Sequence, residues 1–496
     1  MKGVAKGATG SAEGRAARRA LEHHVDPEQS ALNSETEVPA PPGSWQPMRK
    51  LARKALAPVE RFLSIEAASG VLLLLVAVLA LIWANSPWAG LYTSLWHTPL
   101  GLQLGRFAFE RDLHFWINDG LMTVFFFVVG LEIRREIHRG ELSELRRAAL
   151  PIAAALGGMA APAALFLLFN HGRASSVGWG VPMATDIAFA VGVLTLLGKR
   201  VPAALRVLLL ALAVIDDVGS ILVIAFFYST ELAPVGFVVA SAGLLTIVLL
   251  QRTGIRSPWA YVPPALLAWS GAYAAGIHPT LAGVVIGLMT PVTAWYGRER
   301  FVAVAETQVE SLRSATPGDE RALLPHLDKL TAVQREAVSP VERLEHALHG
   351  WVAYVIMPLF ALANAGVPLG AASLEGDGLR VFLGVMLGLV LGKPVGVLGL
   401  TWLATKARLT ALPRGVKWTK VTVVGLCAGI GFTMALFIAQ LAFPPGPLLE
   451  TAKLAILCAS GVSAALAYVV GRWALTSQSE SGQAATPAEA EASTVA

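Results

Sequence analysis

Charged residues are scarce in this 496-residue sequence: Asp, Glu, Lys and Arg make up 15% of it, whereas hydrophobic residues make up 55%. Soluble globular proteins carry about 25% charged residues. The shortage of charge therefore excludes an ordinary soluble protein and favours a multi-pass membrane protein. Residues 1–60 also lack the apolar stretch of a signal peptide, so we expect no cleavable signal.

Cysteine is nearly absent as well. The sequence contains two cysteines, Cys427 and Cys458, and both lie in apolar segments. Without metal-ligand spacing or a second pair, they exclude a disulfide framework and a cysteine metal cluster. We interpret them as small apolar packing residues, and we expect no cofactor.

Long apolar runs are what the sequence does contain, and a run of about 20 residues can cross a membrane. Such runs lie near 67–85, 113–133, 148–169, 176–198, 203–228, 233–250, 258–274, 278–291, 350–368, 379–402, 418–443 and 451–475. The sequence therefore predicts an all-α polytopic membrane protein with about 12 transmembrane helices.

Lys and Arg are distributed unevenly between the segments that connect these runs. If the N-terminal side is inside, the inside segments hold 33 Lys and Arg residues and the outside loops hold 5. Basic residues favour the cytoplasmic side of a membrane, so we predict that both termini are cytoplasmic. This placement also explains the net charge of +5 without a nucleic-acid partner. The one basic residue left over, Lys393, falls inside an apolar run.

The chain divides by composition into a membrane domain and two polar tails. Residues 1–45 and 477–496 have few large apolar groups and are predicted to be disordered cytoplasmic tails. Residues 46–476 form the predicted membrane domain, in contact with lipid, and 296–345 within it are a predicted charged cytoplasmic loop with helical patches. Residues 99–110 predict a small β-hairpin on the outer side, whose free edge could pair with a second copy.

Two of the apolar runs carry helix-breaking residues at comparable depth. These are Gly178, Gly180 and Pro182 in span 4, and Gly425, Gly429 and Gly431 in span 11. Interrupted spans at corresponding positions of two halves indicate inverted repeats and a transport site near the membrane midplane. A small-residue packing face is the alternative for each run alone.

Three carboxylates, Asp186, Asp216 and Asp217, lie inside apolar runs, close to Thr185. A charged side chain at the membrane centre costs roughly 2.5 to 3.5 kcal/mol on insertion scales, so such residues are functional candidates. Hard cations prefer oxygen ligands, and the same carboxylates bind protons. Competition of a cation and protons for one site, open alternately to each side, is sufficient for exchange.

Two other functions remain open on the residues alone. Paired aspartates also suit an intramembrane aspartyl protease, although a Gly-x-Gly-Asp type motif is missing at these positions. A Na⁺-coupled carrier of an organic solute is the nearer alternative, and it would need further polar contacts for the solute.

Several motifs occur in an order typical of one family. They read Trp-Ile-Asn-Asp, Val-Gly-Leu-Glu-Ile-Arg-Arg-Glu, Ala-Thr-Asp-Ile-Ala-Phe-Ala, Ile-Asp-Asp-Val-Gly, Gly-Lys-Pro and Gly-Ile-Gly-Phe-Thr-Met. Together they resemble the NhaA family of bacterial Na⁺/H⁺ antiporters over about residues 60–476. Residues 300–340 look inserted relative to that family.

The resemblance implies a role for each of the marked residues. Asp217 would be the main cation and proton ligand and Asp216 its partner, while Thr185 and Asp186 would lie at the crossing of two broken helices, faced by Lys393. Asp119 would line the outer funnel. The residues implied in pH regulation are Glu132, Glu136, His278, Glu345, His346 and His349.

The resemblance also implies what the whole protein does. It would be a secondary transporter, not an enzyme, that exchanges cytoplasmic Na⁺ or Li⁺ for external H⁺ in a bacterial inner membrane. It would be a pH-regulated homodimer joined at the hairpin, and exchange would be electrogenic. Lys393 is either a proton carrier or a structural counter-ion, with Asp216 as its expected partner.

Overall fold

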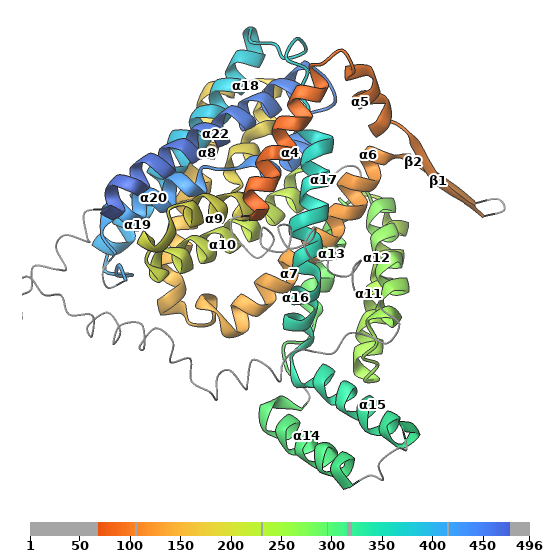
Figure 1. Cartoon of the computed structure of the whole chain (residues 1–496). Coiled ribbons are helices and arrows are strands. Elements are labelled where there is room, and N and C mark those ends of the chain that lie inside the picture. Colours follow the sequence, from red (N-terminus) through yellow and green to blue (C-terminus); the bar gives the residue numbers. More distant parts are fainter. Residues whose placement is uncertain are drawn as a thin grey trace, which may run out of the picture. The chain divides into compact units, whose positions relative to one another are not determined.

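The computed structural model describes residues 68–104, 107–229, 232–294, 296–314, 320–413 and 416–476. The two predicted tails, residues 46–67 and the tip of the hairpin lie outside these ranges. Nearly everything described is helical, as the long apolar runs predict (Figure 1).

Each predicted apolar run coincides with one or more helices. The membrane helices and their flanking turns are α4 (Ala68–Ala84), α5 (Ala89–Trp96), α6 (Leu113–Phe115), η1 (Trp116–Leu121), α7 (Met122–Arg139), η2 (Glu141–Ser143), α8 (Leu145–Asn170), η3 (Ala174–Met183), α9 (Ile187–Leu196), η4 (Gly198–Arg200), α10 (Ala203–Phe227), α11 (Pro234–Arg252), η5 (Pro258–Tyr261), α12 (Val262–Ala274), α13 (Thr280–Met289), α16 (Pro340–Trp351), η6 (Val352–Ile356), α17 (Met357–Asn364), α18 (Gly376–Leu387), η7 (Gly388–Gly392), α19 (Lys393–Lys406), α20 (Trp418–Ala428), α21 (Phe432–Ala442) and α22 (Pro447–Thr476).

Within the described ranges, seven helices are long and apolar enough to cross a membrane, and there are up to ten spans if each bent pair counts as one. The protein is therefore a multi-pass membrane protein. The predicted total of twelve counts α12 and the short helix α13 as two further spans, and it stays a prediction.

Two of the bent pairs are the runs in which helix breaks were predicted. The axes of η3 and α9 differ by 45°, and those of α20 and α21 differ by 48°. Residues 184–186 between η3 and α9 are not helical, and the backbones of Ala184 and Asp186 are extended. The third bent pair, α4 and α5, turns by 114° and was not predicted.

Helices from distant parts of the sequence pack around these breaks. In Figure 1, α19 lies along α8, and α18 and α20 lie against α22. A side chain at Gly157 of α8 would come within 2.0 Å of the carbonyl oxygen of Gly396 in α19. Two glycines therefore allow the backbones of α8 and α19 to approach closely, as is typical of membrane helices.

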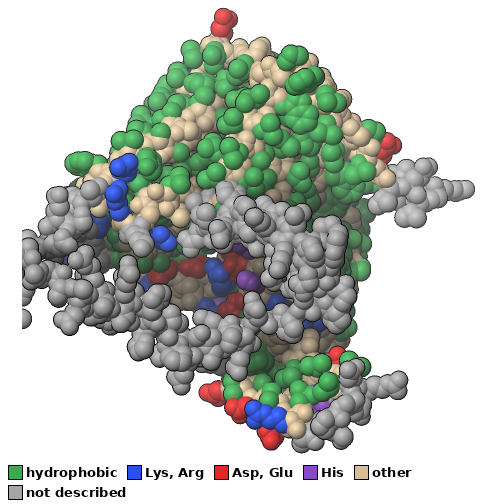
Figure 2. Space-filling view, viewed as in Figure 1, with side chains coloured by type: hydrophobic (Ala, Val, Ile, Leu, Met, Phe, Trp, Pro, Cys, Tyr) green, Lys and Arg blue, Asp and Glu red, His purple; other side chains and the backbone are tan. Residues whose placement is uncertain are grey.

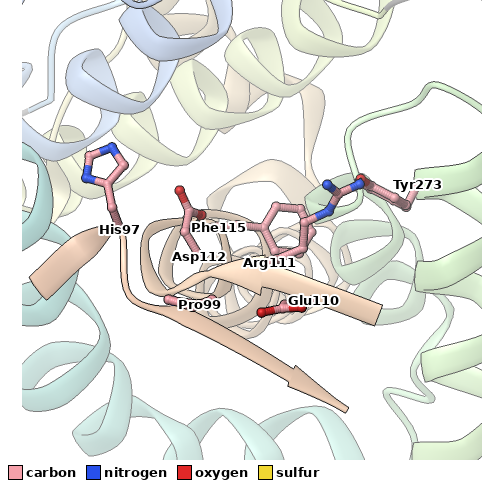
Figure 3. Close-up of a pocket in the computed structure, with 7 residues that line it drawn as sticks. All are labelled: His97, Pro99, Glu110, Arg111, Asp112, Phe115 and Tyr273. Carbon is pink, nitrogen blue, oxygen red and sulfur yellow. Dashed lines mark hydrogen bonds between the residues drawn. The ribbon is translucent and has the colours of Figure 1, made fainter. Parts of the chain in front are cut away.

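The predicted hairpin is present. Strand β1 (Pro99–Leu104) pairs antiparallel with β2 (Phe107–Asp112), so that Leu100 lies opposite Arg111. At its base, Arg111 donates a hydrogen bond to the hydroxyl of Tyr273 in α12, and its guanidinium carbon lies 5.7 Å from the ring centre of Phe115. Figure 3 shows these side chains around a cavity of about 610 Å³.

The region predicted as a charged loop with helical patches is more regular than expected. It contains two helices, α14 (Gly297–Ser314) and α15 (Glu320–Ala337), which pack against each other, and residues 340–345 already belong to α16. Charged side chains are visible on this helical pair, whereas hydrophobic side chains predominate on the upper part of the molecule in the same view (Figure 2). The predicted turn at residues 317–318 lies outside the described ranges.

Candidate functional site

The half-helix α9 begins at Asp186, whose carboxylate caps it. Asp186 Oδ1 accepts a hydrogen bond from the backbone N–H of Phe189 at 3.0 Å. Its Oδ2 accepts from the backbone N–H of Thr433 at 3.1 Å and from the Thr433 hydroxyl. Because Thr433 is in the first turn of α21, one carboxylate lies at the N-termini of both half-helices, where the helix dipole favours negative charge.

The breaks of the two helices meet at this point. The backbone N–H of Asp186 donates to the carbonyl of Ile430 at 2.7 Å, and the hydroxyl of Thr185 lies 3.0 Å from the carbonyl oxygen of Ala428. A side chain at Gly429 would come within 2.6 Å of the carbonyl oxygen of Leu389. The break in α20–α21 therefore needs glycine because neighbouring backbone is so close.

Lys393 is placed at the crossing by α19. Its ammonium group donates to Asp216 Oδ2 and to the hydroxyl oxygen of Thr185, and its side chain is fully buried. Lys393 follows the π-helical turn η7, a local distortion that is frequent at functional sites. The expected partnership of Lys393 with Asp216 is thus present as a buried ion pair.

Asp216 and Asp217 are neighbours on α10 and have 0% and 2% of their surface exposed. Asp216 Oδ2 lies 2.6 Å from the Thr185 hydroxyl oxygen. Asp216 Oδ1 and Asp217 Oδ1 are buried and have no hydrogen-bond partner among the described residues. Buried polar oxygens are rarely left without partners, so these two are candidates for binding a ligand.

The charges at the crossing do not balance. Asp186, Asp216 and Asp217 bring three carboxylates, and Lys393 brings one ammonium, which pairs with Asp216. When all four are ionised, the centre holds two uncompensated negative charges, which is costly in a low-dielectric interior. Protons or a cation would neutralise them.

The carboxylates are grouped more loosely than the ligands of a resident metal ion. Within the described ranges, no three His, Cys, Asp or Glu side chains converge as they do in a metal site. Thr185 and the carbonyls at the helix breaks bring further oxygens close to these carboxylates.

Asp119 and His278, which were assigned separate roles, lie together. Asp119 is in the π-helical turn η1, and its Oδ1 is 3.4 Å from Nδ1 of His278. Both side chains are partly exposed. The ring of His278 also packs edge-on against Phe437 of α21, with 5.9 Å between ring centres.

The acidic residues expected in a regulatory cluster come from two helices that pack together, α7 and α16. Glu345 pairs with Arg135, and Glu342 pairs with Arg139 at 2.8 Å. Glu136 accepts from the backbone N–H of Glu141 at 2.7 Å.

The other expected members of this cluster are Glu132 in α7 and two histidines in α16. The side chain of Glu132 is partly buried, whereas His346 and His349 are exposed on α16. The cluster therefore consists mainly of carboxylates and arginines rather than of histidines.

Several contacts were missed by the sequence reasoning. Thr433 was part of a quoted motif but was given no role. Asn118, Asn364 and Gln440 form a closed ring of hydrogen bonds, which we call the amide ring: Asn364 donates to Asn118 at 2.8 Å, Asn118 donates to Gln440 at 2.7 Å, and Gln440 donates to Asn364. Single amides in apolar runs change hydropathy little, so the ring could hardly be predicted from the sequence.

Two broken helices that cross at a buried charged centre, within an apolar helical chain, are the architecture of a secondary membrane transporter. The family model described as Na⁺/H⁺ antiporter 1 matches residues 60–470. The chain belongs to this family, which confirms the resemblance. Because the family consists of transporters, the protein is not an enzyme, and the protease alternative is wrong.

Curated relatives are similar along almost their whole length. The chain is 57% identical over 470 residues to Na(+)/H(+) antiporter NhaA 2 of Myxococcus xanthus, an alignment that covers 94% of this chain and 98% of the relative. It is 58% identical to Na(+)/H(+) antiporter NhaA 2 of Sorangium cellulosum, covering 92% and 98%. For the protein of that name from Pseudomonas putida the identity is 52%, covering 88% and 98%.

Proposed function

We propose that this protein exchanges Na⁺ or Li⁺ for H⁺ across a bacterial inner membrane, at the crossing of η3–α9 and α20–α21. The observation that carries the proposal is the pair of buried oxygens, Asp216 Oδ1 and Asp217 Oδ1, that have no hydrogen-bond partner among the described residues. Carboxylate oxygens bind hard cations and also bind protons. One site can therefore hold either substrate.

Asp217 is the proposed principal ligand. It is the aspartate at the crossing to which no hydrogen bond is assigned within the described ranges, whereas Asp216 is paired with Lys393 and Asp186 is held by two half-helices. A cation that binds Asp217 displaces its proton. Exposure of the site to one side at a time then couples the inward movement of protons to the outward movement of the cation.

Exchange is electrogenic in this proposal. If Asp217 and either Asp216 or Lys393 each release a proton when Na⁺ binds, more protons than sodium ions move in each cycle. The buried ion pair of Lys393 and Asp216 supports this. A cation that binds beside the pair adds positive charge, which favours release of a proton from it.

The remaining features are proposed from the sequence pattern and the fold together. Residues 46–476 are the transport domain, with twelve spans and both termini in the cytoplasm. Broken helices in 174–196 and 418–442 are consistent with inverted repeats. Asp119 lines the outer entrance, and the contacts between α7 and α16 support pH regulation by the cluster around Glu345.

A homodimer joined at the β-hairpin is also proposed, because β1 and β2 form a two-stranded sheet whose edges can pair with a second copy. The size of the detergent-solubilised protein, with and without residues 100–110, tests this. A truncated protein of unchanged dimeric size would contradict it.

Everted membrane vesicles test the function directly. An acid-inside gradient is set up, and dequenching of an acridine dye is followed after addition of Na⁺, Li⁺ or K⁺ across a range of pH. We expect dequenching with Na⁺ or Li⁺ in the absence of any organic solute. A response that requires a solute would instead favour a Na⁺-coupled solute carrier.

A further inference from the structure

Ser220 is a buried hydroxyl beside the aspartate pair that the sequence reasoning did not consider. It lies on α10, four residues after Asp216 and three after Asp217, and 1% of its surface is exposed. In the part of the chain that the structure describes, its hydroxyl oxygen has no hydrogen-bond partner.

This is unusual for a hydroxyl in a helix, which commonly donates to the carbonyl four residues earlier. This bond forms, for example, at Thr195, which donates to Val191 at 2.8 Å, and at Ser229, two residues after the end of α10, which donates to Ala225 at 2.8 Å. Ser220 does not bond the carbonyl of Asp216, so its hydroxyl is available for another contact.

The helical spacing puts Ser220 between the two aspartates. At 3.6 residues per turn, Ser220 points about 40° around the helix axis from Asp216 and about 60° from Asp217, in the angle between them. All three side chains therefore project from the same side of α10. Residues three and four apart on a helix have Cβ atoms about 5–6 Å apart. Ca²⁺, a hard cation, is held at roughly 2.3–2.6 Å from its oxygen ligands. An ion held at similar distances can therefore touch Ser220 and a carboxylate together.

We propose that the Ser220 hydroxyl is a ligand of the transported cation and sets its affinity relative to that of the proton. Three buried oxygens without partners, on Asp216, Asp217 and Ser220, lie within about one turn of a single helix. A neutral hydroxyl offers lone pairs to Na⁺ but does not accept a proton in the working pH range. It therefore favours the cation without favouring its competitor.

This inference depends on the proposed function, and it makes a further prediction about selectivity. Li⁺ is smaller than Na⁺ and is satisfied by fewer ligands, and ligand number is one determinant of cation selectivity. Loss of one oxygen should therefore weaken Na⁺ binding more than Li⁺ binding. A purely structural role of Ser220 would not change the ratio of the two.

The test is Ser220→Ala in proteoliposomes, with Na⁺ and Li⁺ titrated at fixed pH. We expect the apparent KM for Na⁺ to rise on the order of tenfold, the KM for Li⁺ to rise less, and the maximal rate to stay within about twofold. Ser220→Cys keeps the size but replaces a hard oxygen by sulfur, so it should raise the KM for Na⁺ too, and it serves if the alanine variant does not accumulate.

Thr401→Val is the matched control. Thr401 is fully buried on α19, its hydroxyl also has no partner among the described residues, and it lies eight residues after Lys393. Its replacement should leave both KM values unchanged. An equal rise in KM for Thr401→Val, or unchanged KM values in both Ser220 variants, overturns the assignment.

The wild-type protein separates this inference from the proposed function. If the wild type shows no Na⁺- or Li⁺-dependent proton movement, the proposed function fails, and the role of Ser220 fails with it. If the wild type exchanges normally and the Ser220 variants match its KM values, the role of Ser220 alone is wrong.

Discussion

Two buried polar centres in this protein differ in how completely their hydrogen bonds are made. In the amide ring, each of Asn118, Asn364 and Gln440 both donates to and accepts from another member. At the crossing of the broken helices, Asp216 and Asp217 each keep one buried oxygen without a partner in the described structure. The first centre is neutral and the second has an excess of negative charge.

The difference separates two uses of buried polarity. The amide ring ties η1, α17 and α21 together through its own three hydrogen bonds. His114 of α6 adds a further contact, with its Nε2 2.9 Å from Asn364 Oδ1. An open, charged centre is stable only when something else completes it. We therefore base the proposed ion site on the combination of incomplete hydrogen bonding and excess negative charge, and not on burial alone.

The largest expected effect comes from Asp217→Asn, which removes the proposed principal ligand from the open centre. Exchange should fall to less than about a tenth of wild type, because the variant lacks both the charge that balances Na⁺ and the proton carrier. Vesicle dequenching measures this.

Folding of this variant is checked by its elution from a size-exclusion column. Asp377→Asn is the control, because Asp377 is an exposed partner of Arg173 at 2.6 Å and lies outside the site. Exchange well above a tenth of wild type in Asp217→Asn would remove Asp217 from the role of principal ligand.

Lys393→Ala tests the same centre by removing its positive charge. It leaves Asp216 buried without its counter-ion, so we expect a loss of about 3–5 kcal/mol in stability unless Asp216 takes up a proton. Thermal unfolding in detergent measures the loss, and Na⁺ efflux from proteoliposomes under a potassium–valinomycin potential measures electrogenicity.

In the wild type, an inside-negative potential should accelerate efflux, and indifference to the potential would contradict electrogenic exchange. A heat-labile Lys393→Ala that remains electrogenic would make the lysine structural and leave the second proton to Asp216.

Asn364→Ala opens the amide ring. Because it leaves Asn118 and Gln440 each without one partner, we expect a loss of about 1–3 kcal/mol in stability, read as a lower Tm. The KM for Na⁺ should change by less than about twofold, since the ring is neutral and already complete. A large change in the KM for Na⁺ with an unchanged Tm would contradict the distinction between a structural amide ring and a charged transport centre.

The smallest expected effect concerns the cluster between α7 and α16. In the double variant Glu345→Ala with His346→Ala, the pH of half-maximal exchange should move by about half a unit or more, while the maximal rate changes less than about twofold. A regulatory cluster biases a conformational equilibrium without supplying ligands. An unchanged pH profile would place the regulation elsewhere in the chain.

Much of the charged centre could be predicted because charged residues are rare inside apolar runs and are therefore easily recognised there. Asp216, Asp217 and Lys393 were found in this way, and the hairpin followed from its short alternating runs. The joint capping by Asp186 could not be predicted, since Asp186 and Thr433 are 247 positions apart and meet only in the folded chain. The pairing of Asp119 with His278 depends on tertiary contacts in the same way.

The amide ring and the α14–α15 pair show two other limits. Asn364 and Gln440 lie singly in their runs, and Asn118 was noted only as part of a motif, so the ring is not evident until the three side chains meet. Charged residues occur throughout residues 297–337, so the sequence predicted a loop with helical patches. The structure has two helices of 18 residues each there.

The carboxylate of Asp186 links the N-terminus of α9 to the N-terminus of α21 by hydrogen bonds. If one half-helix tilted alone, at least one of the bonds to Phe189 or Thr433 would break where water cannot replace it. If the two half-helices move together, all of these hydrogen bonds are kept, so separate motion costs more free energy. We therefore expect the two half-helices to travel as one rigid body while the site changes sides, and a constant distance between spin labels on α9 and α21 throughout the cycle is the corresponding observation.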